Sequence, residues 1–245
     1  MEYDVKKRKL IGSCIILSLI SLMFTLVQSD AIIPNKSLAR SESTQYEQKI
    51  EWNQTFGGTG EDAAYALIQT IDGGFALVGV TESHGAGRFD IWLIKIDANG
   101  VAQWNQTFGG TENDGAYSAI QTTDGGFALA GLTRSYGTGE FDMWLVKTDA
   151  HGVAQWNKTF GGADFDHAYA LIETTDGGFT LVGSTRSYGA GEFDMWLVKT
   201  DAHGVAQWNQ TYGGTEWDNA YALIQTTDGG VALAGSTRSY GAGES

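Results

Sequence analysis

The sequence is poor in cysteine and proline, with one of each in 245 residues. Because Cys14 is the sole cysteine, no disulfide can form within the chain, and a stable fold must depend on its hydrophobic core. The single proline, Pro34, contrasts with 34 glycines. Abundant glycine with so little proline favours short strands joined by tight turns over helices.

Basic residues are also few, since 15 lysines and arginines stand against 29 aspartates and glutamates and give a net charge of -14. Such a chain is unsuited to binding nucleic acid by neutralising phosphates. The four histidines show no metal-ligand spacing, and no serine or cysteine nucleophile with a positioned base is visible. The sequence therefore yields no candidate catalytic residue and no cofactor, apart from the calcium hypothesis below.

The first residues have the pattern of an export signal. Lys6 to Lys9 form a basic cluster, an apolar run follows from Leu10 to Gln28, and Ser29 is a small residue suited to cleavage. The run is also almost long enough to span a bilayer, so an uncleaved membrane anchor is the alternative. Residues 1–29 are therefore predicted to be a signal peptide or anchor, and the polar residues 30–48 a linker. Either case predicts an extracellular or cell-surface location.

Residues 49–245 consist of repeats. Trp52, Trp104, Trp156 and Trp208 recur every 52 residues, which divides the chain into units 52–103, 104–155, 156–207 and a partial unit 208–245. In the first unit, strand-like segments cover 63–70, 75–81, 90–97 and 101–107, separated by glycine-containing turns. Four consecutive antiparallel strands at this period predict an all-β β-propeller, with Trp92, Trp144 and Trp196 packed between blades.

The number of strands is odd. One fourth-type strand is expected near 50–56, followed by three complete sets of four and two further strands at 219–226 and 231–237. Fifteen strands are one short of four blades. The chain is therefore interpreted as about four repeats with the last incomplete, and a fragment of a larger propeller is the favoured explanation.

The repeat resembles those of exported and cell-surface propeller proteins of archaea and bacteria. The shared pattern is W-N-x-T-[FY]-G-G, D-x-A-Y, D-G-G and G-x-G-x-x-D-x-W-L-x-K-x-D-x-x-G, and it covers residues 52–245. A looser similarity links the D-A-x-G turn to the tryptophan-docking turn of quinoprotein propellers and to the Asp-box of sialidases. The aspartate spacing differs from both, so only a shared blade construction is implied.

The units differ most in the joint between one unit's fourth strand and the next unit's first strand. On a propeller this joint lies on the face that commonly binds ligands. Its distinctive side chains are the predicted binding residues: Phe165, His167, Trp217 and Asn219. Neutral drift of an exposed loop is the alternative explanation.

An aspartate within the same joint does not vary between units: Asp62, Asp114, Asp166 and Asp218. Its carboxylate is expected to cap the backbone amides of its own turn. The alternative hypothesis is a ring of carboxylates that holds Ca²⁺.

Two further patterns recur. Glu82 and Arg88 exchange places in later units, as Arg134 with Glu140 and Arg186 with Glu192, which predicts an ion pair across the loop base in at least the second and third units. Each fourth strand also carries an N-x-T sequon, at Asn53, Asn105, Asn157 and Asn209. These asparagines are predicted glycosylation sites, or else they mark a polar edge strand.

These features favour an exported, non-enzymatic propeller that binds an extracellular glycan or protein. The alternative is a glycan-active hydrolase or lyase that uses acidic residues on the variable-loop face. Paired carboxylates beside an aromatic platform would favour the enzyme.

Overall fold

A computed structural model describes residues 52–241 of the chain. The signal or anchor at 1–29, the linker at 30–48 and the last four residues lie outside the described residues. The chain divides into two compact parts, residues 1–55 and residues 56–245, and every described strand belongs to the second part. Within residues 52–241 there is no helix capable of crossing a membrane.

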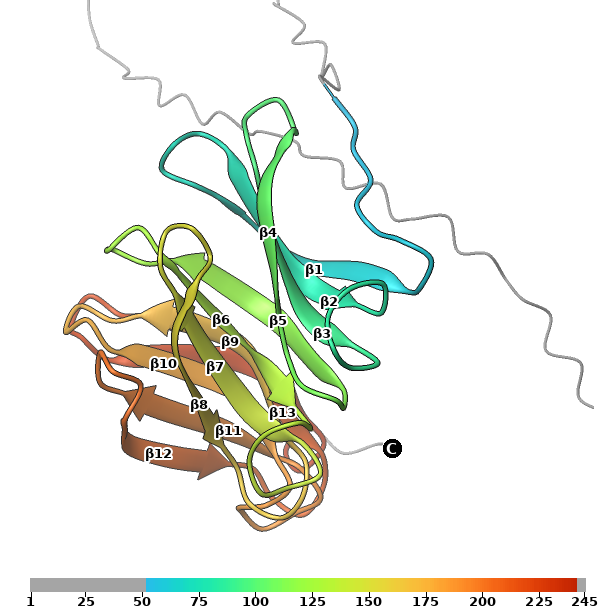
Figure 1. Ribbon diagram of the computed structural model, residues 1–245. Coiled ribbons are helices and arrows are strands. Elements are labelled where there is room, and N and C mark those ends of the chain that lie inside the picture. Colours follow the sequence, from blue (N-terminus) through green and yellow to red (C-terminus); the bar gives the residue numbers. More distant parts are fainter. Residues whose placement is uncertain (1–51, 242–245) are drawn as a thin grey trace, which may run out of the picture. The chain divides into compact units, whose positions relative to one another are not determined.

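The described strands of this second part form antiparallel sheets, in which the strands pair in sequence order. Three sheets have four strands and the fourth has two, as the colours of Figure 1 allow the reader to follow. The first sheet contains β1 (Asp62–Gln69), β2 (Phe75–Thr81), β3 (Asp90–Ile96) and β4 (Ala102–Phe108). The second contains β5 (Asp114–Gln121), β6 (Phe127–Thr133), β7 (Asp142–Thr148) and β8 (Ala154–Phe160). The third contains β9 (Asp166–Glu173), β10 (Phe179–Thr185), β11 (Asp194–Thr200) and β12 (Ala206–Tyr212), and the last contains β13 (Asp218–Gln225) and β14 (Val231–Thr237).

Burial within a sheet follows strand order. In the second sheet every residue of β7 and nearly every residue of β6 is buried, whereas β8 is half-exposed or exposed throughout. The middle strands therefore have neighbours on both faces, which explains their nearly continuous apolar sequences. Each four-stranded sheet is thus a meander whose fourth strand lies at the outer edge.

The core lies between successive sheets. One cluster joins Ile91 and Leu93 of the first sheet to Phe127 and Trp144 of the second. The next cluster joins Met143 and Leu145 of the second sheet to Phe179 and Trp196 of the third. Face-to-face packing of four-stranded meanders is the construction of β-propeller blades, so the all-β, propeller-type fold is confirmed.

The predicted strand boundaries in the first unit agree with the structure to within one residue, but the additional strand expected near 50–56 is wrong. Residues 52–61 form no strand. A fourth strand needs a third strand to pair with, and the last sheet ends with its second strand, β14. The described residues therefore form fourteen strands.

Candidate functional site

Successive sheets are joined at one end by a repeated set of backbone contacts. We call each set of contacts, with the side chains around it, a junction. At the first junction, between the first and second sheets, Phe89 forms a parallel bridge with Asn113, and its carbonyl accepts a hydrogen bond from the Asp114 amide at 2.7 Å. The second junction uses Phe141 with Phe165, and the third uses Phe193 with Trp217. The backbone is the same at each junction, so differences between them must come from side chains.

The first junction contains a pocket of about 370 Å³. Its aromatic walls come from Tyr65, Tyr117, Phe89 and Phe141. Its polar walls are Glu61, Asn113 and Asp114, and Val80, Gly115 and Leu132 complete the lining. Apolar rings with a few polar groups are the usual composition of a small-molecule binding site.

The pocket exists because two residues of the second repeat, 104–155, are small. Asn113 occupies the position that Phe165 and Trp217 hold in the later units, and Gly115 the position of His167 and Asn219. A Cβ on Gly115 would lie 2.8 Å from Val80 Cγ1, which shows how closely the two sheets approach there.

At the second junction, large side chains occupy the corresponding space. Phe165 stacks on Phe141 with a ring-centroid distance of 5.5 Å and an interplanar angle of 27°. His167 lies among Phe141, Phe165, Tyr169 and Phe193, with centroid distances between 6.0 and 6.4 Å. Burial lowers the pKa of His167, and the Asp166 carboxylate opposes this effect. His167 is therefore a neutral ring within an aromatic cage at neutral pH.

The third junction is filled in another way. The Trp217 ring lies 4.8 Å from the ring of Phe193, and its Nε1 donates a hydrogen bond to Glu192 Oε2. Asn219 is half-buried beside it on β13. The four predicted binding residues thus divide between two junctions, and their role in binding stays a prediction.

The invariant aspartates close their own turns. Asp114 is buried, and its carboxylate accepts hydrogen bonds from the Gly110 amide at 2.8 Å, from Ser135 Oγ at 2.5 Å and from Thr133 Oγ1. Asp62, Asp166 and Asp218 accept equivalent bonds from a glycine amide and a serine hydroxyl. The predicted capping role agrees with these contacts.

The calcium hypothesis for these carboxylates stays a prediction. Burial raises the pKa of Asp62, but hydrogen bonds from Ser83 and Thr81 outweigh it and lower that pKa. Among residues 52–241 no three acidic, histidine or cysteine side chains are grouped closely enough to hold a metal ion. Both carboxylate oxygens of Asp62, Asp114 and Asp166 accept hydrogen bonds within their own turns, whereas Asp218 Oδ1 has no partner among the described residues.

The glycine doublets before these aspartates have a steric cause. A Cβ on Gly109 would collide with the carboxylate of Asp90 and would lie 2.9 Å from Asp114 Oδ2. Asp90 in turn accepts hydrogen bonds from the amides of Ala86 and Gly87 at 2.8 and 2.9 Å. The doublet lets carboxylates from two successive sheets approach one backbone segment.

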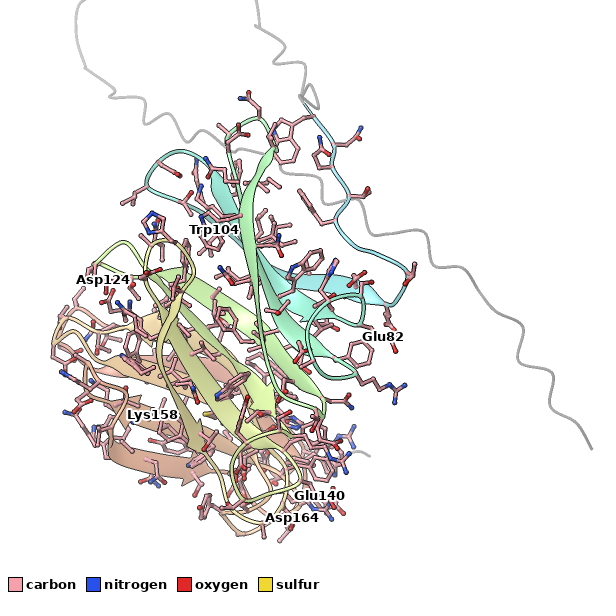
Figure 2. The ribbon with its side chains drawn as sticks, viewed as in Figure 1. Glu82, Trp104, Asp124, Glu140, Lys158 and Asp164 are labelled. Atoms are coloured by element: carbon pink, nitrogen blue, oxygen red, sulfur yellow. The ribbon has the colours of Figure 1, made fainter. Side chains whose placement is uncertain are left out.

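The predicted ion pairs across the loop base are largely wrong. Arg88 Nε lies 4.0 Å from Glu82 Oε1 in the first unit, as expected. In the second unit Arg134 pairs instead with Glu112, also at 4.0 Å. No ion pair in the described part of the chain joins Arg134 to Glu140 or Arg186 to Glu192. Figure 2 shows Glu140 at the same end of the sheets as Asp164, near the variable joint of the third unit.

A buried lysine at the opposite end was not recognised from the sequence. Lys147 donates from Nζ to Asp124 Oδ2 at 2.8 Å and to the Thr148 carbonyl at 2.8 Å. Burial raises the pKa of Asp124, but the hydrogen bonds from Lys147, Thr122 and the Gly126 amide outweigh it and lower the pKa to about 2. Lys95 with Asp72 and Lys199 with Asp176 repeat the pair. These pairs support the turns at the other end of the sheets from Glu140, as the positions of Asp124 and Glu140 in Figure 2 show.

The sequon asparagines Asn105, Asn157 and Asn209 are exposed on the outer strands β4, β8 and β12. Each side-chain oxygen accepts a hydrogen bond at 3.2 Å from the Trp92, Trp144 or Trp196 indole of its own sheet. Asn53 precedes the first sheet. Glycosylation of these residues stays a prediction.

The repeated sheets and their junctions define an all-β repeat protein with propeller-type blades. No known family model matches the chain. Regulatory protein FlaEY of Caulobacter vibrioides is 28% identical over 203 residues, which are 76% of this chain and 19% of that protein.

Two solved structures resemble the chain weakly. The match to a protein of unknown function from Bacteroides caccae covers 75% of this chain and 56% of that protein's chain, with 9% identity and a TM-score of 0.46. The match to Sqt1 from Chaetomium thermophilum covers 69% of this chain and 40% of the Sqt1 chain, with 14% identity and a TM-score of 0.39.

Proposed function

We propose that this chain is part of an exported, non-enzymatic binding protein that holds a glycan in the pocket of the first junction. The observation that carries the proposal is the pocket itself, about 370 Å³ with four aromatic walls and the polar groups of Glu61 and Asn113. Tyrosine and phenylalanine rings offer flat apolar surfaces to the C–H face of a sugar. Carboxylate and amide groups beside them can bind its hydroxyls.

The size of the pocket favours a glycan over a protein as the ligand. Stable protein interfaces bury roughly 800 Å² on each partner, whereas small ligands enter concave pockets of about 300–1,000 Å³. A protein ligand would therefore have to insert a side chain or a chain end at this point. The alternative ligand is an extracellular protein that does so.

The extracellular or cell-surface location is part of the same proposal. Its support is the basic cluster and apolar run of residues 1–29, together with the resemblance of the repeats to those of exported propeller proteins. The exposed sequons on the outer strands are compatible with glycosylation of an exported chain.

A hydrolase or lyase is the alternative, because Glu61 and Asp114 line the same pocket. A glycosidase needs two carboxyl groups that are free to act as acid and as base or nucleophile. Asp114 is instead buried, with hydrogen bonds from a backbone amide and two hydroxyls. This disfavours catalysis, since its carboxylate is committed to the turn.

The test is a glycan array followed by calorimetry with the wild type and Asn113→Phe. A phenylalanine at 113 should stack on Phe89 as Phe165 stacks on Phe141, and should close the pocket. We expect the affinity for a captured neutral glycan to fall at least about tenfold, or 1.4 kcal/mol. The matched control is Ile71→Phe, which adds a ring at an exposed position of the turn between β1 and β2 and should leave binding unchanged.

Two outcomes would contradict the proposal: a wild-type protein that captures no glycan, or an Asn113→Phe variant that binds as tightly as the wild type. Chromatography of the captured oligosaccharide after incubation separates binding from hydrolysis. Shortened products that disappear in Glu61→Gln would favour the enzyme.

A further inference from the structure

A row of four tyrosines runs from the pocket across all the sheets. Tyr65, Tyr117, Tyr169 and Tyr221 lie at equivalent positions of β1, β5, β9 and β13. The ring centroids of neighbours are 5.2, 5.8 and 5.3 Å apart, with interplanar angles of 52°, 42° and 52°. Because Tyr65 and Tyr117 also line the pocket, the row continues it over the third and last sheets.

A β-bulge places each tyrosine in the row. The pairing of β1 with β2 shifts between Ala64 and Ala66, so Tyr65 is the extra residue, and the other three first strands shift at the same point. Opposite the bulge, a Cβ on Gly79 would collide with the Ala63 carbonyl, so the close approach of the strands requires glycine there. Bulges re-aim side chains, and this one is repeated four times.

The row is exposed at its two ends and half-buried in its middle. Tyr65 is 53% exposed and Tyr221 is 52% exposed, while Tyr117 and Tyr169 are half-buried between their neighbours. Burial and the nearness of Tyr65 and Tyr169 raise the pKa of Tyr117, so its phenol stays protonated and can donate a hydrogen bond. The row therefore offers a series of similar apolar faces with hydroxyl groups, one on each sheet.

The charge of the protein limits what can lie along such a row. Single-stranded nucleic acid also stacks on aromatic rings, but its binding needs a positive groove. The chain carries a net charge of -14, and Glu61 lies in the pocket wall. An acidic polysaccharide would be repelled for the same reason, which favours a polymer without negative charge.

We propose that the tyrosine row is an extended binding track for a linear neutral polysaccharide, whose end or branch occupies the pocket of the first junction. This inference rests on the proposed function and names its ligand class. Successive sugar units would contact successive tyrosines, so affinity should grow with chain length. The pocket alone would not produce such growth beyond the few units that it can hold.

The test is calorimetry with β-1,4-linked oligosaccharides of glucose, mannose and N-acetylglucosamine, each from two to eight units long. We expect one series to gain about tenfold or more in affinity between the disaccharide and the hexasaccharide. Tyr221→Ala, which lies far along the row from the pocket, should reduce hexasaccharide binding at least about threefold and leave disaccharide binding unchanged. Tyr221→Phe keeps the ring and should retain most of the gain.

The outcomes separate the track from the pocket. Affinity that does not change with length, or a Tyr221→Ala variant that binds every length like the wild type, would overturn the track and leave the pocket proposal standing. A wild type that binds no member of the three series, and no neutral glycan on the array, would overturn both. Because Tyr221 is exposed, the alanine variant should fold, and its melting temperature checks this.

Discussion

The first and second junctions share one backbone but differ in what fills them. At the first junction, Asn113 and Gly115 leave a pocket between Phe89 and Phe141. At the second, Phe165 stacks on Phe141 and His167 occupies an aromatic cage. The difference teaches that, in this repeat, a pocket forms where small side chains replace large ones on a constant backbone frame.

The backbone frame and the core beneath it should be equally stable at both junctions. Trp144 lies in the core between the first and second sheets, and Trp196 in the core between the second and third, with 2% and 3% exposure. We expect Trp144→Ala and Trp196→Ala each to lower the free energy of unfolding by about 3–5 kcal/mol, because each leaves a cavity. Urea denaturation measures both, and losses differing by more than about 2 kcal/mol would show that the frames are unequal.

The lysine–aspartate pairs stabilise the sheets at the end opposite to the junctions. Asp124→Asn removes the counter-charge of the buried Lys147 ammonium and should cost about 2–3 kcal/mol. The matched control is Asp228→Asn in the last sheet, where Thr226 and the Gly230 amide donate to an exposed carboxylate, and it should cost much less than Asp124→Asn.

The same pair predicts a pH dependence. The pKa of Asp124 falls from 3.8 to about 2 on folding, so the folded state favours the ionised carboxylate. The stabilisation is therefore complete above pH 3.8 and is lost as the pH falls towards 2. In this pH range the free energy of unfolding should therefore fall less steeply for Asp124→Asn than for the wild type. An acid-denaturation midpoint and slope that do not change in the variant would contradict the account.

Exchanging the side chains between junctions tests the comparison itself. The double variant Phe165→Asn with His167→Gly gives the second junction the small residues of the first. It should lose about 1–3 kcal/mol of stability, since the stacking and the burial of two rings disappear. Asn113→Phe should be neutral or slightly stabilising. A double variant as stable as the wild type would mean that Phe165 and His167 do not fill the junction.

The smallest expected effect concerns His167. Burial lowers its pKa below 6.5, so the unfolded chain binds a proton more readily than the folded one. Stability contributed by this residue is complete above pH 6.5 and declines as the pH falls below it. His167→Asn, the residue of the fourth unit, should reduce the loss between pH 7.5 and 5.5 by under about 1 kcal/mol. Urea midpoints of both proteins at both pH values measure this, and equal losses would argue against a caged neutral histidine.

Much of the fold could be predicted from the sequence because the repeat states it four times. The 52-residue period set the sheets, and the aspartate–glycine turns set the strand ends to within one residue in the first unit. The additional strand near 50–56 failed because strand character in a sequence does not supply a partner for pairing. The register shift that creates the tyrosine row leaves no mark on the spacing, so the D-x-A-Y pattern gave no sign of the row.

The pocket was harder to foresee. Variation between the units selected Phe165, His167, Trp217 and Asn219 as binding residues, and three of these side chains are large. A large residue can equally fill a space, and only the packing of two sheets shows that Asn113 and Gly115 leave one open. The comparison of small with large residues at equivalent positions was the available signal. The exchanged charges misled in a similar way, since Arg134 contacts Glu112, which lies in the joint that precedes β5.

The number of glycan molecules bound per chain tests the central claim most directly. Calorimetric titration with the glycan selected on the array should give one site for the wild type and none for Asn113→Phe. Phe165→Asn with His167→Gly should give a second, weaker site, because the new pocket would have Asn113 in the place of Glu61. If the double variant folds and still binds one molecule, or if Asn113→Phe still binds one, the open first junction does not define the site.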